Sequence, residues 1–270
     1  MFKKSVHIDL MYTELPYEER FAAAKADGFN AVEFYVEGWE DKDLPRIKQL
    51  LDENGLVMSA ATGATPYTMC DPLQRDDYIN HIKKLVEACK VIKCPMLMCH
   101  SNLLDPETNY AAKVLPYDYS DTRKVCAMYD VLKTIAPICA EAGVSVTLEP
   151  LSDLAHPGYF MHDFKICADI IRAVNEPNIK GLFDCYHMYI EEGNLSADLE
   201  KYIDVIGHVH IADAPGRHDP GTGDINYANI LRTLSKLPYN GYVAFEFYPI
   251  DGTPKAIEAI NRVLDGLDVN

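Results

Sequence analysis

Short apolar runs rich in β-branched and aromatic residues alternate with longer amphipathic segments along the whole chain, and this alternation constrains the fold more than any other feature. The strand-like runs occupy 5–10, 30–36, 56–62, 95–100, 144–150, 179–187, 207–213 and 241–249. The helix-like segments occupy 17–28, 41–55, 71–92, 122–143, 163–175, 197–202, 227–237 and 253–267. Alternation favours a parallel sheet with right-handed crossovers, and eight units favour closure. The sequence therefore predicts an α/β protein, a (β/α)8 TIM barrel forming a single domain over residues 1–270.

Charge and composition exclude several classes of function. The formal net charge of -16 gives a field that repels phosphodiester backbones and anionic membranes, so we expect no nucleic-acid and no membrane partner. No apolar run reaches the roughly 18 residues of a membrane span, and the N-terminus does not resemble a signal peptide. The eight cysteines form no C-x-x-C pair, which indicates buried thiols in a reducing, cytoplasmic setting. The absence of Walker-type and G-x-G-x-x-G elements argues against a nucleotide cofactor.

Acid or imidazole side chains stand at or near the ends of the last four strand-like runs. They are Glu149 in VSVTLEP, Asp184 in IKGLFDCYH, His210 in IGHVHIADAPGR and Glu246 in GYVAFEFYP. Because the carboxyl ends of barrel strands converge, these four side chains can share one cation. A mostly oxygen ligand set suits Mg²⁺ or Mn²⁺, with Co²⁺ also acceptable, better than structural zinc. Capping or loop anchoring is the alternative for any one of them, but barrel packing does not require four such residues in consecutive units.

Glu149 and Glu246 also predict acid–base chemistry. Two carboxylates on opposite sides of a small substrate can move a proton between adjacent carbons, one as general base and the other returning it. A divalent cation on the carbonyl and hydroxyl oxygens would stabilise the enediolate between them.

Several further residues are candidates for substrate contact. His187 follows the sixth strand and is expected in a loop above the metal, the alternative being a surface histidine. Arg217 lies in the long Pro/Gly-rich loop 214–226 over the barrel mouth, where it could hold a hydroxyl or carboxylate, or form a salt bridge at the rim. His7, Glu33 and His100 fall on the first, second and fourth strands and could reach the mouth.

Two positions remain open between packing and function. His208 precedes His210 by two residues, so both should face the barrel interior, where His208 is a partner of His210 or a histidine satisfied by other groups. Trp39 and Tyr67 could line the pocket or simply pack.

Longer motifs resemble a known family. They are ELPYEERFAAAKADGFNAVEF, LEP followed by HPGYF, FDCYHM with EEGNL, IGHVHIADAPGR with INY, and FEFYP. Together they resemble the hydroxypyruvate isomerase family, within the xylose isomerase-like barrel superfamily that also holds ketose 3-epimerases. The resemblance spans about residues 5 to 250.

The resemblance implies a function for the same residues. Glu149, Asp184, His210 and Glu246 would bind the metal, the two glutamates would be the acid–base pair, and His187 and Arg217 would contact substrate. The substrate would be a small hydroxy-keto acid or sugar, and the protein could be a homo-oligomer.

Other functions compete with the isomerase. The closest alternative is a ketose 3-epimerase of the D-tagatose or D-psicose type, which uses the same glutamates on one carbon. A non-catalytic sugar-binding relative is a further alternative. An endonuclease IV-like phosphodiesterase is disfavoured, because it would need a larger His-rich zinc set and a basic face.

Overall fold

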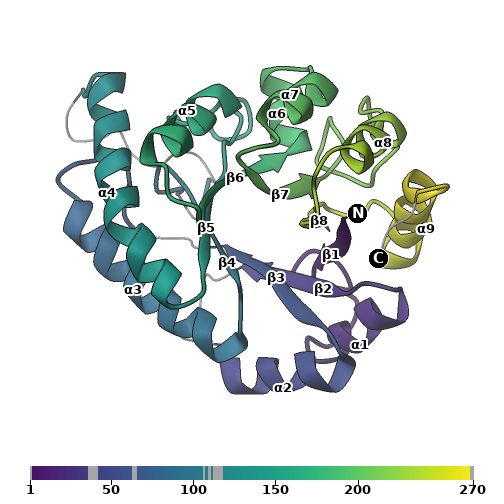
Figure 1. The fold of residues 1–270 in the computed structure, drawn as a ribbon. Coiled ribbons are helices and arrows are strands. Elements are labelled where there is room, and N and C mark those ends of the chain that lie inside the picture. Colours follow the sequence, from purple (N-terminus) through teal and green to yellow (C-terminus); the bar gives the residue numbers. More distant parts are fainter. Residues whose placement is uncertain are drawn as a thin grey trace.

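Eight parallel strands close into a barrel and helices surround it (Figure 1). The structure is a computed structural model, and it describes residues 2–35, 42–62, 66–105, 107, 108, 111 and 118–267. The strands are β1 (Lys3–His7), β2 (Ala31–Tyr35), β3 (Val57–Thr62), β4 (Met96–Cys99), β5 (Ser145–Leu148), β6 (Ile179–Asp184), β7 (Ile206–Ile211) and β8 (Tyr242–Phe245). Each strand pairs with the next along the chain, and β8 pairs with β1. The predicted fold class is confirmed.

The helices lie outside the barrel and cover its apolar strands (Figure 1). They are α1 (Glu19–Ala26), α2 (Leu44–Asn54), α3 (Arg75–Ile92), α4 (Asp121–Glu141), α5 (Phe164–Val174), α6 (Cys185–Glu191), α7 (Leu195–Tyr202), α8 (Tyr227–Lys236) and α9 (Thr253–Leu264). Polar side chains define several helix starts: Asp43 accepts a hydrogen bond from the Arg46 N–H at 3.0 Å, and Asp163 from the Ile166 N–H at 2.7 Å. Because the strands are parallel and helices connect them, the helix starts lie at the end of the barrel where the strands end.

One element differs from the sequence prediction. The sequence predicts a loop at His187 after the sixth strand, but β6 ends at Asp184 and the helix α6 begins at the next residue. The Asp184 carboxylate accepts a hydrogen bond from the Tyr186 N–H at 2.8 Å, which satisfies a free donor of the first helical turn. His187 therefore lies on a helix, and the prediction of a loop position was wrong.

The cysteines lie where the sequence predicts. All eight are free thiols, and only Cys126 is exposed. Burial raises the pKa of Cys139 and Cys99 to about 12, so both stay protonated and unreactive at neutral pH.

Candidate active site

The four side chains predicted to bind a metal meet at one end of the barrel. Asp184 is the last residue of β6, His210 is in β7, and Glu149 and Glu246 directly follow β5 and β8. One ligand atom from each lies within 4.8 Å of those of the other three, and all four residues are buried. The structure thus brings together the residues that the sequence singles out, because the last four strands are neighbours in the closed barrel.

The chemistry of this cluster fits a divalent cation. Three carboxylates and one imidazole are the donors, and the buried Oε1 atom of Glu149 has no hydrogen-bond partner among the described residues. A buried oxygen without a partner is unfavourable unless a ligand or water satisfies it. Hard oxygen donors with one imidazole favour an ion such as Mn²⁺ or Mg²⁺.

Burial and close charges shift the pKa values of the cluster in different directions. Burial raises the pKa of Asp184 to about 6, although the Arg217 guanidinium opposes this shift. Burial would also raise the pKa of Glu246, but Arg217 and His210 hold it well below its ordinary value. Burial would lower the pKa of His210, yet the carboxylates of Glu246 and Glu33 raise it well above the usual range. Glu246 therefore stays ionised at neutral pH, and Asp184 takes up a proton more readily than Glu246.

Arg217 reaches the cluster from the loop after β7. Its Nη2 atom contacts Glu246 Oε2 and lies 3.4 Å from Asp184 Oδ2. Arg217 has φ +57°, and the preceding Gly216 has φ +94°. This left-handed backbone pair turns the arginine inward, so the loop over the mouth carries a permanent positive charge into the site.

Asp213 organises the same loop and was missed in the sequence analysis. Its buried carboxylate accepts backbone hydrogen bonds from Ala214 at 2.9 Å, Ile225 at 3.1 Å and Gly221 at 2.6 Å. A Cβ atom on Gly223 would lie 2.1 Å from the Ala214 carbonyl oxygen, so the turn closes too tightly for any side chain there. An acid at the entry to a Pro/Gly-rich segment was the available signal.

His187 directs one ring nitrogen at the cluster. Its Nδ1 accepts from the backbone N–H of Ser152 at 3.2 Å, so the proton is on Nε2. Nε2 lies 3.7 Å from Asp184 Oδ2 and has no hydrogen-bond partner among the described residues. Burial lowers the pKa of His187 well below its ordinary value, and Arg217 lowers it further. A neutral imidazole therefore presents an N–H donor to the site.

His7 and His100 also lie beside the glutamates. His100 Nε2 is 3.2 Å from Glu149 Oε2. His7 is fully buried, and neither of its ring nitrogens has a partner among the described residues. Its ring centroid lies 4.2 Å from that of Tyr35, with the two rings tilted by 49°. Tyr35, which the sequence analysis did not identify, donates to Glu246 Oε1 at 3.2 Å.

Glu33 pairs in register with His7 and contacts both histidines of β7. Its Oε2 is 3.0 Å from His210 Nε2, and its Oε1 is 2.6 Å from His208 Nε2. Both Glu33 and His208 are fully buried. As expected, His208 and His210 both face the interior. Trp39 lies outside the described residues, and Tyr67 is half-buried against the core.

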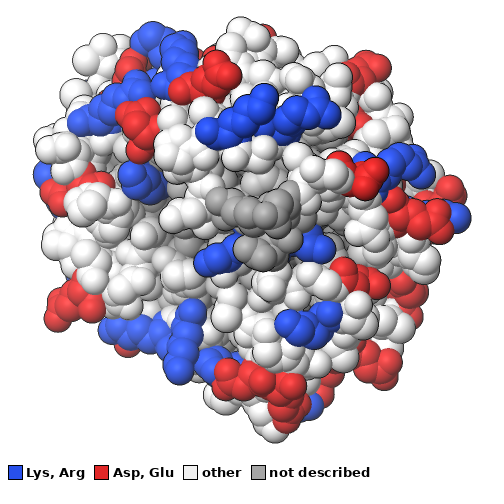
Figure 2. Space-filling model, turned by 45° about the vertical axis from the view of Figure 1, so that its right-hand side comes forward, with Lys and Arg blue, Asp and Glu red and all other residues white. Residues whose placement is uncertain are grey.

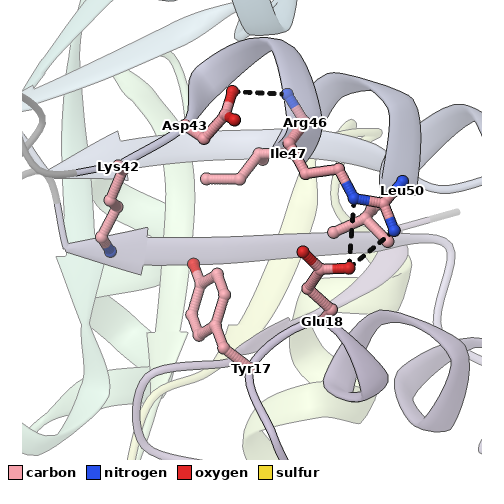
Figure 3. A pocket seen from close by; sticks show the side chains of 7 residues that line it. All are labelled: Tyr17, Glu18, Lys42, Asp43, Arg46, Ile47 and Leu50. Atoms are coloured by element: carbon pink, nitrogen blue, oxygen red, sulfur yellow. Dashed lines mark hydrogen bonds and ion pairs between the residues drawn. The ribbon is translucent and has the colours of Figure 1, made fainter.

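A separate pocket of about 230 Å³ lies between α1 and α2, lined by Tyr17, Glu18, Lys42, Asp43, Arg46, Ile47 and Leu50 (Figure 3). Its charged side chains form ion pairs with one another or with neighbouring residues: Arg46 pairs with Glu18, and Lys42 Nζ lies 3.2 Å from Asp9 Oδ2. The charged groups that line the pocket are therefore already paired.

The outer surface carries mixed charge. Figure 2 shows basic and acidic side chains interspersed on one face, without a continuous basic area. Among the described helices, none combines the length and apolar character needed to cross a membrane.

Comparison with known proteins identifies the family. The sequence model of the xylose isomerase-like TIM barrel family matches residues 21–264. The chain is 30% identical to a 2-oxo-tetronate isomerase of Cupriavidus necator, covering 92% of this chain and 94% of that protein. It is 25% identical to the hydroxypyruvate isomerase of Escherichia coli, covering 92% and 94%. A crystal structure titled as an AP endonuclease, family 2, from Brucella melitensis superposes with a TM-score of 0.84 over 95% of this chain and 97% of that one, and its 24% identity supports the fold alone. The chain belongs to the xylose isomerase-like TIM barrel family.

Proposed function

We propose that this protein is a metal-dependent isomerase that moves a proton between adjacent carbons of a small hydroxy-keto acid or sugar. The observation that carries the proposal is the buried convergence of Glu149, Asp184, His210 and Glu246 within 4.8 Å. The relatives named 2-oxo-tetronate isomerase and hydroxypyruvate isomerase favour a hydroxy-keto acid as the substrate.

The four cluster residues would hold one Mn²⁺, Mg²⁺ or Co²⁺ ion. When bound, such an ion supplies Lewis-acid polarisation of the substrate carbonyl and hydroxyl oxygens. The remaining chemistry belongs to the side chains of the protein.

Glu149 and Glu246 differ in how they are held, and this suggests their roles. Glu246 is engaged by Arg217, Tyr35 and His210, whereas one oxygen of Glu149 is free among the described residues. Glu149 would take the proton from the hydroxyl-bearing carbon, leaving an enediolate. A water held by the Glu246 carboxylate would place a proton on the adjacent carbon and would be restored by the proton on Glu149, while a proton moves from one substrate oxygen to the other. The atoms of the substrate are conserved, as an isomerisation requires.

His187, Arg217, His7 and His100 would orient the substrate. The Nε2–H of His187 can donate to a substrate oxygen, and Arg217 can pair with the carboxylate of a keto acid. His7 offers two unpartnered nitrogens beside Tyr35. The carboxylate preference of arginine is a reason to favour keto acids over neutral ketoses.

A substrate panel in D₂O tests the proposal. Metal-free protein is loaded with Mn²⁺ and incubated with small keto acids and ketoses, and products are followed by NMR and mass spectrometry. Carbonyl migration with deuterium on the adjacent carbon is expected for the isomerase, and EDTA should stop it. Deuterium at a retained, inverted C3 would replace the proposal with a ketose 3-epimerase.

Two variants test the acid–base pair in the same assay. Glu149→Gln and Glu246→Gln should each lower turnover to below a few per cent of wild type, because general acid–base catalysis contributes about 10²–10⁴ in rate. Asp198→Asn, an acid-to-amide change at a buried position on the outer helix α7, is the matched control. Wild-type turnover in either glutamate variant would contradict the assigned chemistry.

A further inference from the structure

A buried polar network runs beneath the candidate metal centre, from β1 across β3 and β2 to β7. Ser5 Oγ is 2.6 Å from Ser59 Oγ, and the Ser59 hydroxyl donates to Glu33 Oε1 at 2.6 Å. Glu33 in turn contacts both histidines of β7. All five residues are at most 1% exposed, so bulk water cannot satisfy any of them. The barrel interior normally holds apolar side chains, and so a carboxylate there requires a reason.

Hydrogen-bond accounting at Glu33 determines the orientation of His210. A carboxylate only accepts, so the nitrogen facing each Glu33 oxygen must carry a proton. In the metal-free protein both ring nitrogens of His210 face carboxylate oxygens, Nε2 at 3.0 Å from Glu33 Oε2 and Nδ1 at 2.9 Å from Glu246 Oε2, so both carry protons. Nδ1 is the nitrogen that faces the cluster, also 3.8 Å from Glu149 Oε1, and a cation held there would take the place of its proton, whereas Nε2 would keep its proton for Glu33.

The distances also argue against a second ion at Glu33. Contacts of 2.6 and 3.0 Å between the Glu33 oxygens and the two histidine nitrogens are hydrogen-bond lengths. Neighbouring ligand atoms that each lie about 2.0–2.2 Å from a six-coordinate ion are roughly 2.8–3.1 Å apart, so the 2.6 Å separation of Glu33 Oε1 and His208 Nε2 is too short for two ligands of one ion. The geometry of Glu33 and His208 therefore does not fit a shared metal ion.

We infer that Glu33 is a positioning residue, held by Ser59 and His208, that fixes the ring orientation and tautomer of His210 so that Nδ1 faces the metal centre. Glu33 lies at a register shift between β2 and β3, where the paired positions skip from Val32 to Phe34. This irregularity places Ser59 of β3 within hydrogen-bond reach of the Glu33 carboxylate. The inference rests on the proposed metal centre and assigns Glu33 to its support, not to contact with substrate.

The test measures metal binding directly. Metal-free wild type and Glu33→Gln are titrated with Mn²⁺ by isothermal calorimetry, and free Mn²⁺ is followed by EPR. Loss of a carboxylate that supports a metal-ligating histidine typically weakens metal binding about 10–100-fold, and we expect that loss in the variant. Asp198→Asn should bind Mn²⁺ like wild type. Glu33→Asp keeps the charge but shortens the side chain by one methylene, so it should also bind Mn²⁺ more weakly than wild type. This variant replaces Glu33→Gln in the test if the amide variant does not fold.

The outcomes separate this inference from the proposed function. Wild type that binds one Mn²⁺ per chain, with weaker binding in both Glu33 variants, supports the inference. At saturating Mn²⁺ the substrate KM of Glu33→Asp should stay within about twofold of wild type, because Glu33 acts through the metal ligand. Equal Mn²⁺ affinity in the Glu33 variants, or two ions per wild-type chain, would overturn the inference alone. Wild type that binds no divalent ion would overturn the proposed metal centre as well.

Discussion

The Asp213 carboxylate is the best place to test how the loop that carries Arg217 is held. Its Oδ1 accepts from the N–H groups of Ala214 and Ile225, which are buried, and its Oδ2 accepts from Gly221, which is exposed. Asp213→Asn keeps an oxygen for the first two donors and turns an amide N–H₂ toward Gly221. Because the Gly221 N–H can turn to water instead, this change should cost only about 1 kcal/mol.

Asp213→Ala should cost considerably more. It leaves the buried N–H groups of Ala214 and Ile225 without acceptors, at about 1–3 kcal/mol each, or about 4 kcal/mol together. At ~2–4 °C per kcal/mol for domains of this general size, the melting temperature should fall by about 8–16 °C, against about 2–4 °C for the asparagine variant. The loop would also hold Arg217 less firmly, so the substrate KM should rise.

Thermal denaturation followed by circular dichroism provides the assay. Asp224→Ala removes an exposed acid from the same loop and should leave the melting temperature unchanged. If Asp213→Ala melts within about 2 °C of wild type, the buried hydrogen bonds do not stabilise the loop as argued. If the asparagine and alanine variants are equally destabilised, the division between the two carboxylate oxygens is wrong.

Two further predictions concern the charges of the site. Because burial raises the pKa of Asp184 to about 6, a proton competes with Mn²⁺ below that pH, and calorimetry should show affinity falling by up to about tenfold per pH unit. The folded metal-free protein binds the Asp184 proton more tightly than the unfolded chain does, so the stability that this proton contributes is present at low pH and is lost as the pH rises through about 6. Mn²⁺ affinity that does not change between pH 5 and 7 would refute the role of Asp184 as a metal ligand. Arg217→Met removes the cation beside Glu246 and Asp184 and should destabilise the metal-free protein by about 2–3 kcal/mol. This cost is at or below the smallest cost usually found for breaking a buried ion pair, about 3 kcal/mol, because the Arg217 side chain is 16% exposed. Saturating Mn²⁺ should restore most of that loss, because the ion would neutralise the same carboxylates that Arg217 neutralises in the metal-free protein. An equal drop in melting temperature with and without Mn²⁺ would contradict this explanation.

The alternation of strand and helix segments determined the barrel, because periodicity and turn residues are local properties of the chain. The four cluster residues could be predicted from the same local pattern, because each lies in the last positions of a strand or directly after it. The ends of parallel strands converge in a closed barrel, so these side chains meet. The tertiary structure alone decided how the site is supported. Ser152 and Tyr35 act through partners distant in sequence, and no spacing rule predicts contacts that depend on how loops and strands pack together. Glu33 shows the same limit: its strand position made it a candidate for the mouth, and only the packing of β7 opposite β2 turned its carboxylate toward His210.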